Sequence, residues 1–439
     1  MKKIFLCSAA AALLAGCSGP KSQDLFADPD NDRIAAYDSL SVFHVPVKQI
    51  TFGPKYHWFA YYDKQECDPT GRYVLSMQTD FQHRSPTGDD VIKIGMVDLE
   101  DGCKWIELGK SEAWGWQQGC QLQFIPGTDS KVLWNDKEGD NFVCRIMDIE
   151  TREMRTIPRA VYALSPDGKW AVTTDYRRVN DTRPGYGYAG IPDPNRDVLA
   201  PEDSGIWRIN LETGESELII SLAQIAAIPN PLDDYSEAKH WFNHLLYNTD
   251  GSRFEFLHRW RFPDSLRNAQ YEDVGGFGTQ MLTASAEGKD VRIIDPYNYT
   301  SHFIWKDAEH ILAWTKLPET GFGFYLFRDS ETPDIRQIGK EQMPLNGHCT
   351  YLPAPYNDWI LNDTYPDENR MQSVYLFHEP TGRRVPIAEL YSPEAFQGEW
   401  RCDTHPRSTQ DGRRVIVDGP MSGGRQLYIF DIGSILDAE

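Results

Sequence analysis

Short runs of apolar residues, each ending in a turn rich in Pro, Asp, Asn and Gly, recur along the chain. After each turn a second apolar run begins, either alternating or continuous, as in residues 73–75 (Tyr-Val-Leu). This is the pattern of a strand that leaves a tight turn. The turns occupy residues 68–73, 126–130, 165–170, 249–253, 306–310, 355–359 and 410–414.

A second kind of turn, which begins with an acidic or polar residue, lies between successive members of the first set. These turns occupy residues 98–102, 148–151, 210–214, 285–288, 329–332 and 379–382. Two hairpin turns per unit predict a four-stranded blade, and seven such units predict a closed ring. Several unrelated all-β domains are the alternative, but the two turns alternate without a break from residue 67 onward. The sequence therefore predicts an all-β fold, a seven-bladed β-propeller of four-stranded antiparallel blades.

Length and charge limit the number of domains and the classes of partner that we expect. The chain has 439 residues, and we expect one propeller domain over residues 41–439, acting as a monomer. Its formal net charge of −21 argues against nucleic acid as a partner, because phosphate binding needs a broad basic surface. A small acidic ligand is compatible with this charge where cations gather locally.

The N-terminus has the pattern of a targeting segment. Lys2 and Lys3 precede an apolar stretch over residues 4–14, too short to span a bilayer, which leads to Cys17 after small residues. This resembles a bacterial lipoprotein signal, in which the cysteine is acylated. We expect residues 1–17 to be a signal peptide, Cys17 to be lipidated, and residues 18–40 to be a polar tether. The protein would be exported, in the periplasm or at the cell surface, and would touch the membrane only through its lipid anchor. An ordinary signal peptide with an incidental Cys17 is the alternative.

Six cysteines remain after this leader, in a compartment that permits disulfides. Cys67, Cys120 and Cys144 are explained as buried thiols in strands. Cys349 and Cys402 each lie close to a histidine. They either supply thiolates to a zinc site or join two neighbouring blades as a disulfide.

Histidines precede the first strand of several blades. His244 and His405 both lie seven residues before the glycine of their turn, and His302 and His348 occupy comparable segments of the two blades between them. The first strand of a propeller blade lines the central channel, so we expect these four side chains to meet at one mouth. Converging imidazoles suit manganese or zinc, with calcium as a further candidate. Taken singly, each histidine is also explained as a hydrogen-bonded structural residue.

Insertions bring arginines and aromatic residues to the third and fourth blades. Arginine forks bind carboxylates, and aromatic faces stack on sugars, so these segments predict a pocket for an acidic sugar. Pairing of the arginines with Asp175, Asp181 and Asp193 is the alternative. The candidate substrate-binding residues, including three near the start of the first two blades, are Arg177, Arg183, Arg261, Tyr62, Trp116 and Gln117.

The repeats resemble TolB-type propeller repeats, and the ring with histidines at its mouth resembles the oligogalacturonate lyases over residues 56–432. The resemblance implies a manganese ion on His302, His348 and His405, with His244 as a further candidate, and an arginine base, which we assign to Arg259. The chain is also similar to seven-bladed lyases that act on ulvan or on rhamnosyl-glucuronate. That similarity implies that His57 and His83, with Tyr62 or Tyr188, act near the substrate carboxylate.

Three functions are compatible with these residues. The first is a lyase that cleaves a uronate-containing oligosaccharide by β-elimination, for which arginine, histidine, tyrosine and a metal supply the chemistry. The second is a glycoside hydrolase, which needs two opposed carboxyl groups; Asp63, Asp136, Asp363 and Asp403 are the candidates. The third is a non-catalytic propeller that binds a glycan or a protein.

Overall fold

The computed structural model describes residues 25–27, 34, 39–59, 61–263, 271, 275–332 and 334–438. The expected signal peptide, Cys17 and most of the expected tether lie outside these residues. Within the described part of the chain, no helix has the length and apolar character needed to cross a bilayer.

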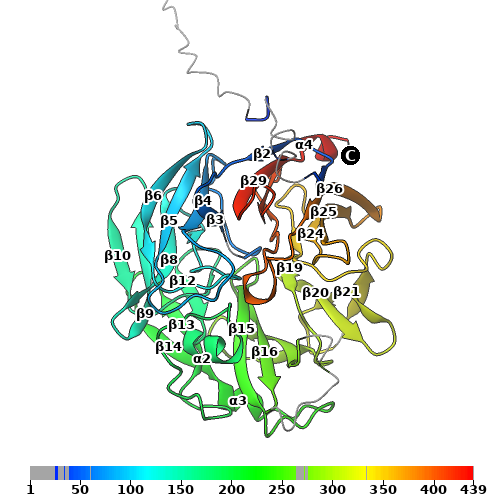
Figure 1. Ribbon diagram of the computed structural model, residues 1–439. Helices are drawn as coiled ribbons and strands as arrows, with labels where there is room; N and C mark the ends of the chain where they lie inside the picture. Colours follow the sequence, from blue (N-terminus) through cyan, green and yellow to red (C-terminus); the bar gives the residue numbers. More distant parts are fainter. Residues whose placement is uncertain are drawn as a thin grey trace, which may run out of the picture.

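Seven antiparallel sheets stand around a central axis, which confirms the predicted seven-bladed propeller (Figure 1). We number the blades in chain order and give each from its first strand outward. Blade 1 is β3 (Tyr56–Trp58), β4 (Tyr73–Thr79), β5 (Ile92–Asp98) and β6 (Lys104–Ser111). Blade 2 is β7 (Gln123–Phe124), β8 (Lys131–Glu138), β9 (Asn141–Asp148) and β10 (Met154–Ile157). Blade 3 is β11 (Ala163–Leu164), β12 (Trp170–Thr173), β13 (Gly205–Asn210) and β14 (Ser216–Ser221). Blade 4 is β15 (Lys239–Tyr247), β16 (Arg253–Arg261), β17 (Gly278–Ser285) and β18 (Arg292–Asp295). Blade 5 is β19 (Phe303–Trp305), β20 (His310–Leu317), β21 (Gly321–Arg328) and β22 (Ile335–Ile338). Blade 6 is β23 (Thr350–Tyr351), β24 (Trp359–Asp363), β25 (Met371–His378) and β26 (Arg383–Tyr391). Blade 7 takes β27 (Arg407–Ser408), β28 (Arg414–Gly419) and β29 (Gln426–Asp431) from the end of the chain.

The two kinds of turn have distinct places in every blade. The first kind joins the first and second strands, and the second kind joins the third and fourth, in the six blades where the sequence contains it. Gly168 shows why a glycine is needed there: its φ is +67°, and a Cβ atom would lie 2.3 Å from the carbonyl oxygen of Pro126 in blade 2. A side chain at this position would therefore meet both backbone strain and the neighbouring blade.

The ring is closed by both ends of the chain, which the repeat pattern did not reveal. Strand β2 (Val47–Gln49) pairs with β29 as the fourth strand of blade 7, and β1 (Val42–Phe43) adds a fifth strand to blade 6 beside β26. A buried ion pair reinforces the closure: Arg407 of blade 7 lies 2.8 Å from Glu66, which follows the first strand of blade 1. Neighbouring blades cover both faces of each sheet, so strands such as β16 are buried almost throughout.

Helical segments are short and lie between strands or at the end of the chain. The insertion of blade 3 begins as α2 (Tyr176–Thr182), whose first turn is capped by the side chain of Asp175. Further helices among the described residues are α3 (Leu222–Ala226), the 3-10 helix η3 (Gly398–Trp400) and α4 (Gly433–Leu436).

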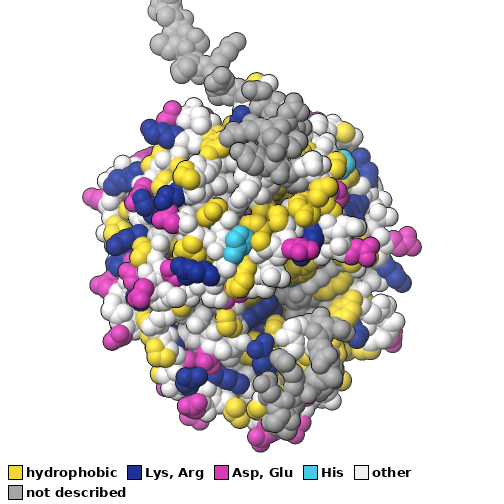
Figure 2. Space-filling view, viewed as in Figure 1, with side chains coloured by type: hydrophobic (Ala, Val, Ile, Leu, Met, Phe, Trp, Pro, Cys, Tyr) yellow, Lys and Arg dark blue, Asp and Glu magenta, His cyan; other side chains and the backbone are white. Residues whose placement is uncertain are grey.

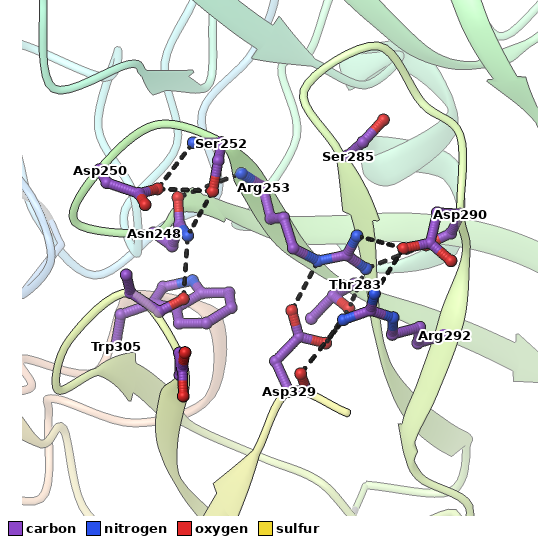
Figure 3. Close-up of polar contacts among 12 residues, drawn as sticks. Asn248, Asp250, Ser252, Arg253, Thr283, Ser285, Asp290, Arg292, Trp305 and Asp329 are labelled. Atoms are coloured by element: carbon purple, nitrogen blue, oxygen red, sulfur yellow. Dashed lines mark hydrogen bonds and ion pairs between the residues drawn. The ribbon is translucent and has the colours of Figure 1, made fainter. Parts of the chain in front are cut away.

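Blades 4 and 5 are joined by an ion-pair network at the ends opposite the histidine segments (Figure 3). Asp329 of blade 5 lies 2.5 Å from Nε of Arg253 and 3.4 Å from Nη1 of Arg292, both from blade 4. Its carboxylate also accepts a hydrogen bond of 2.8 Å from the hydroxyl of Thr283. Asp290 pairs with the same two arginines from the solvent side.

Replacing Asp329 with alanine is expected to lower the free energy of unfolding by about 3 kcal/mol, because two guanidinium groups lose a carboxylate that is only 2% exposed. Urea unfolding at neutral pH measures this change. Asp307→Ala is the matched control, since Asp307 lies in an exposed turn of the same blade, and its effect is expected to be below about 1 kcal/mol. Equal losses in the two variants would contradict a specific role for the network.

Candidate active site

Three histidines from consecutive blades lie against one another. The ring centroids of His302 and His348 are 4.4 Å apart, and those of His348 and His405 are 4.3 Å apart. His244, from blade 4, joins this group through an aromatic side chain: the ring of Tyr61 lies 5.0 Å from His244 and 5.2 Å from His405. All four imidazoles are buried. The structure thus brings together the four residues that the sequence placed at one mouth.

The shared spacing of His244 and His405 corresponds to a shared backbone conformation. Both residues have positive φ, 51° and 40°, which non-glycine residues rarely adopt. Such strained conformations concentrate at functional sites, where the surrounding structure holds them.

The donor set for a metal includes a residue that the sequence analysis did not assign to it. One ligand atom from each of His348, Asp403 and His405 lies within 4.8 Å of the others. Oδ1 of Asp403 and Nε2 of His405 are buried and have no hydrogen-bond partner within the described residues. Buried polar atoms of this kind are rarely left unpaired, and a divalent cation would satisfy them. The signal that could have revealed Asp403 is its Asp-x-His spacing, which keeps its carboxylate close along the chain to a histidine already assigned to the site.

Neighbouring polar groups orient the imidazoles. Nδ1 of His348 lies 3.0 Å from both carboxylate oxygens of Asp363, and the hydroxyl of Thr404 donates to the same carboxylate at 2.5 Å. Nδ1 of His302 similarly lies 2.9 Å from Oδ1 of Asn346. The hydrogen bond at Nδ1 of His348 leaves its Nε2 for a metal, as in most protein metal sites.

Burial favours the neutral imidazole that metals bind. It lowers the pKa of His244, His302 and His405, and nearby His348 adds to the effect at each.

The two cysteines near the cluster are free thiols, so no disulfide joins Cys349 and Cys402. Burial raises the pKa of Cys402 to about 12 and raises that of Cys349 further. Both thiols therefore stay protonated at neutral pH, a form that does not favour metal binding. The nitrogen and oxygen donors above fit a divalent ion better.

A cavity of about 580 Å³ opens beside the histidines. It meets the cluster at His302, whose ring nitrogens lie 3.3 Å from the hydroxyl of Ser301 and 3.4 Å from that of Tyr365, both in the cavity wall. Figure 2 shows basic side chains recessed in a hollow of the face that it draws. The lining residues are Arg183, Arg259, Arg261, Gly275, Phe277, Thr300, Ser301, Trp314, Phe322, Asn346, Tyr365 and Arg401.

Four arginines concentrate positive charge in this cavity, in a chain of net charge −21. Arg259 is 4% exposed, and its Nε and Nη1 have no hydrogen-bond partner within the described residues. Arg401 donates to the hydroxyl of Tyr186 at 2.8 Å and pairs with Asp403 at 2.7 Å. A buried guanidinium with open donors is suited to a carboxylate, which it binds through two parallel hydrogen bonds.

Tyr62 crosses the channel beside the histidines and does not line the cavity. It comes from blade 1, and its hydroxyl donates to the carbonyl oxygen of Phe303 in blade 5 at 2.9 Å. The same hydroxyl lies 3.4 Å from Nε2 of His244. Next to it, Asp63 contacts His244 at 3.4 Å and Lys64 at 3.2 Å, and all of these side chains are buried. Tyr62 therefore packs against the histidine cluster and helps to position it.

Two histidines assigned from the ulvan-type similarity lie apart from the cavity. His57 is buried in β3, with its ring nitrogens 3.0 Å from Gln426 and 2.8 Å from Gln78. His83 is near the surface, where Nδ1 lies 3.0 Å from the carbonyl oxygen of Ala395. Neither histidine lines the cavity.

Three further candidates are held by packing or hydrogen bonds elsewhere. Tyr188 is fully buried, stacks on Tyr176 at 4.1 Å and accepts a hydrogen bond from Asn135. The indole of Trp116 packs on other tryptophans and donates to a backbone carbonyl, as does the amide of Gln117. None of the three lines the cavity.

Of the two candidate arginines in the blade 3 insertion, one forms an ion pair with an aspartate and the other lines the cavity. Arg177 pairs with Asp175 at 2.7 Å, as the ion-pair alternative expected, and lies outside the cavity. Arg183 lines the cavity, where its guanidinium lies 3.8 Å from the ring centroid of Tyr186.

Solved structures share this arrangement of blades. An oligogalacturonate lyase in complex with manganese matches 89% of this chain and 94% of its own, with a TM-score of 0.62 and 16% sequence identity. The chain has the fold of the oligogalacturonate lyases. A second oligogalacturonate lyase, from Vibrio parahaemolyticus, matches 88% of this chain and 94% of its own, with a TM-score of 0.59 and 16% identity. No protein family model and no curated protein matches the sequence.

The buried histidines predict a loss of stability in mild acid. Burial lowers the pKa of His57 and of His240 to about 4, so between pH 6.5 and 4 the unfolded chain binds protons that the folded chain does not. The free energy of unfolding is therefore expected to fall as pH falls through this window, by up to about 1.4 kcal/mol per pH unit for each histidine. Urea midpoints at several pH values measure the slope. His57→Gln is expected to reduce the slope by the contribution of one histidine. An unchanged slope would contradict the lowered pKa of His57 as a cause.

Proposed function

We propose that the protein is a lyase that cleaves a uronate-containing oligosaccharide by β-elimination. One observation carries the proposal: four arginines line the same cavity that borders a buried cluster of histidines and Asp403. The arginines supply recognition of an acidic sugar, and the buried cluster supplies a place for a divalent ion. The likeness in fold to oligogalacturonate lyases supports the same function.

Elimination from a uronate removes the proton at C5, forms a double bond between C4 and C5, and breaks the C4–O bond. Arg259 is buried, and its Nε and Nη1 have no hydrogen-bond partner within the described residues. In its neutral guanidine form it would accept the C5 proton on one nitrogen and hold the carboxylate through its remaining N–H groups, and it would become the guanidinium in that step. We assign it the role of the base. The hydroxyl of Tyr365, in the cavity wall, is placed to donate a proton to the departing oxygen.

A metal bound by His348, Asp403 and His405, with His302 beside them, would supply positive charge against the carboxylate as negative charge develops there. Manganese and zinc both suit the donor set of two imidazoles and a carboxylate. We favour manganese, because a solved lyase of the same fold contains it.

The geometry favours elimination over hydrolysis. A glycosidase needs two carboxyl groups on opposite sides of the scissile bond. Among the described residues, no aspartate or glutamate lines the cavity. Each of the four candidates is paired with another side chain: Asp63 with Lys64, Asp136 with Arg145, Asp363 with His348, and Asp403 with Arg401.

The test is the ultraviolet absorbance of the product. Elimination creates a double bond conjugated with the carboxylate, so incubation with uronate oligosaccharides and manganese is expected to raise the absorbance steadily. Oligosaccharides reduced at their carboxyl groups to neutral sugars are the matched control and should give no increase. No increase across uronates of different configuration would contradict the proposed lyase.

We also propose that the protein is exported and anchored to the membrane through a lipid on Cys17. Metabolic labelling with a radioactive fatty acid tests it, with Cys17→Ala expected to abolish the label. Label retained in that variant would contradict the anchor.

A further inference from the structure

Two aromatic rings form a ledge in the cavity wall contributed by blade 5. Trp314 on β20 and Phe322 on β21 both line the cavity, and their rings are nearly parallel, at 11°, with centroids 6.1 Å apart. Phe322 is 37% exposed, which is unusual for a large apolar side chain in this structure, whereas Trp314 is only 6% exposed. An apolar face left open inside a polar cavity is a common feature of ligand sites.

Three of the four arginines of the cavity face a different ring, that of Phe277, and the fourth, Arg401, lies 5.7 Å from the ring centroid of Tyr365. The guanidinium groups of Arg183 and Arg259 each lie 5.0 Å from the ring centroid of Phe277, and that of Arg261 lies 5.5 Å from it. Within the described part of the chain, no arginine lies over Trp314 or Phe322. The wall is thus divided into a basic part around Phe277 and an apolar part at the ledge.

One cation lies near the ledge, and its position limits what it can bind. The ammonium group of Lys316 lies 5.2 Å from the ring centroid of Phe322 and 5.0 Å from that of Tyr299. It therefore already interacts with two aromatic faces. Lys316 is not among the residues that line the cavity.

The ledge adjoins the reacting centre. The backbone N–H of Trp314 donates to the carbonyl oxygen of His302 at 2.8 Å. This hydrogen bond joins the backbone of the ledge directly to that of the histidine cluster. Ser301 and Asn346, hydrogen-bonded to each other at 3.1 Å, also line the cavity and contact His302. A sugar on the ledge would consequently neighbour a sugar held at the histidines and arginines.

We propose that the ledge of Trp314 and Phe322 is a subsite for a neutral sugar ring, so that the substrate is a mixed oligosaccharide in which the uronate is linked to a neutral sugar. The inference rests on the proposed function for the uronate at the arginines. The C–H groups of a neutral pyranose carry slight positive charge and suit the electron-rich face of an aromatic ring. A second uronate would bring its carboxylate toward that negative face without an arginine to balance it, and the ammonium group of Lys316 is already placed over the rings of Phe322 and Tyr299.

Isothermal titration calorimetry with two disaccharides tests the subsite. One probe is an aldobiouronic acid, a uronate joined to a neutral hexose, and the other is a diuronate; titrations are run in the cold, and chromatography verifies that both remain intact. We expect the wild-type protein to bind the aldobiouronic acid more tightly. Phe322→Ala is expected to weaken that binding about tenfold while leaving the diuronate nearly unchanged.

Matched variants separate stacking from general damage. Phe322→Tyr keeps the ring and should keep the preference. Leu345→Ala removes another exposed apolar side chain, next to the lining residue Asn346, and should change neither affinity. Equal losses for both probes in Phe322→Ala, or no loss, would overturn the proposal. Tighter binding of the diuronate that is lost in Lys316→Gln would show that the ledge holds a uronate.

The calorimetric outcome is independent of catalysis. Selective binding of the aldobiouronic acid without any unsaturated product would retain the subsite and refute the lyase. Unsaturated product together with an unselective Phe322→Ala would retain the lyase and refute the subsite.

Discussion

Replacing Arg259 with lysine is expected to lower the rate of elimination by about a hundredfold or more while the fold remains intact. Arg259 is buried in the cavity wall, and two of its guanidinium nitrogens have no hydrogen-bond partner in the described residues. A lysine could also carry a proton, but it lacks the planar fork that holds a carboxylate through two hydrogen bonds. Losing one such preorganised contact usually costs a factor of about 10² to 10³ in turnover. Initial rates of absorbance increase measure the effect.

Arg177→Lys is the matched control for this variant. Arg177 belongs to the blade 3 insertion and is paired with Asp175, outside the cavity. Its replacement is expected to leave the rate near the wild-type value, and thermal unfolding should show both variants folded. A near-normal rate in Arg259→Lys would remove Arg259 from the reaction.

Loss of bound metal is the second large effect that we expect, from His348→Ala and from Asp403→Asn. The ligand atoms of His348, Asp403 and His405 lie within 4.8 Å of one another, so removing one donor leaves too few to hold the ion. Elemental analysis after dialysis against manganese should find about one ion per wild-type chain and almost none in either variant. Asp363→Asn, which changes the partner of His348 and none of the three proposed ligands, is expected to weaken metal affinity by about 10- to 100-fold.

His57→Gln is the matched control, because His57 is a buried histidine that lies outside the cavity and has amide partners of its own. Its metal content should equal that of the wild type. Unchanged metal in His348→Ala and Asp403→Asn would refute the site, whatever the activity of the variants.

The seven blades could be predicted from the sequence because each repeat contains its own turn residues and its own apolar strand pattern. Turn residues such as Gly168 meet demands of backbone conformation and of close approach between blades, and both recur at fixed places. The closure of the ring could not be predicted in the same way. Strand β2 has only three residues and no turn of its own, and its place on β29 depends on a partner almost 400 residues away.

The candidate site could be predicted where it follows the repeat, and not where it depends on side-chain contacts. His244, His302, His348 and His405 share an equivalent place in successive blades, so the ring brings them together. Asp403 carried no signal of its own beyond its spacing from His405. Tyr188 and Trp116 have residue types suited to sugar binding, yet packing against other aromatic side chains buries them away from the cavity.

The masses of the products test the central claim, that this cavity performs elimination, most directly. Mass spectrometry of a single cleavage of a defined uronate oligosaccharide should find two fragments whose masses sum to that of the intact substrate, because elimination adds no water. The fragment with the new non-reducing end should be the unsaturated one, and both fragments should be lacking with Arg259→Lys over the same time. Fragments that sum to the substrate plus one water would show hydrolysis and contradict the account.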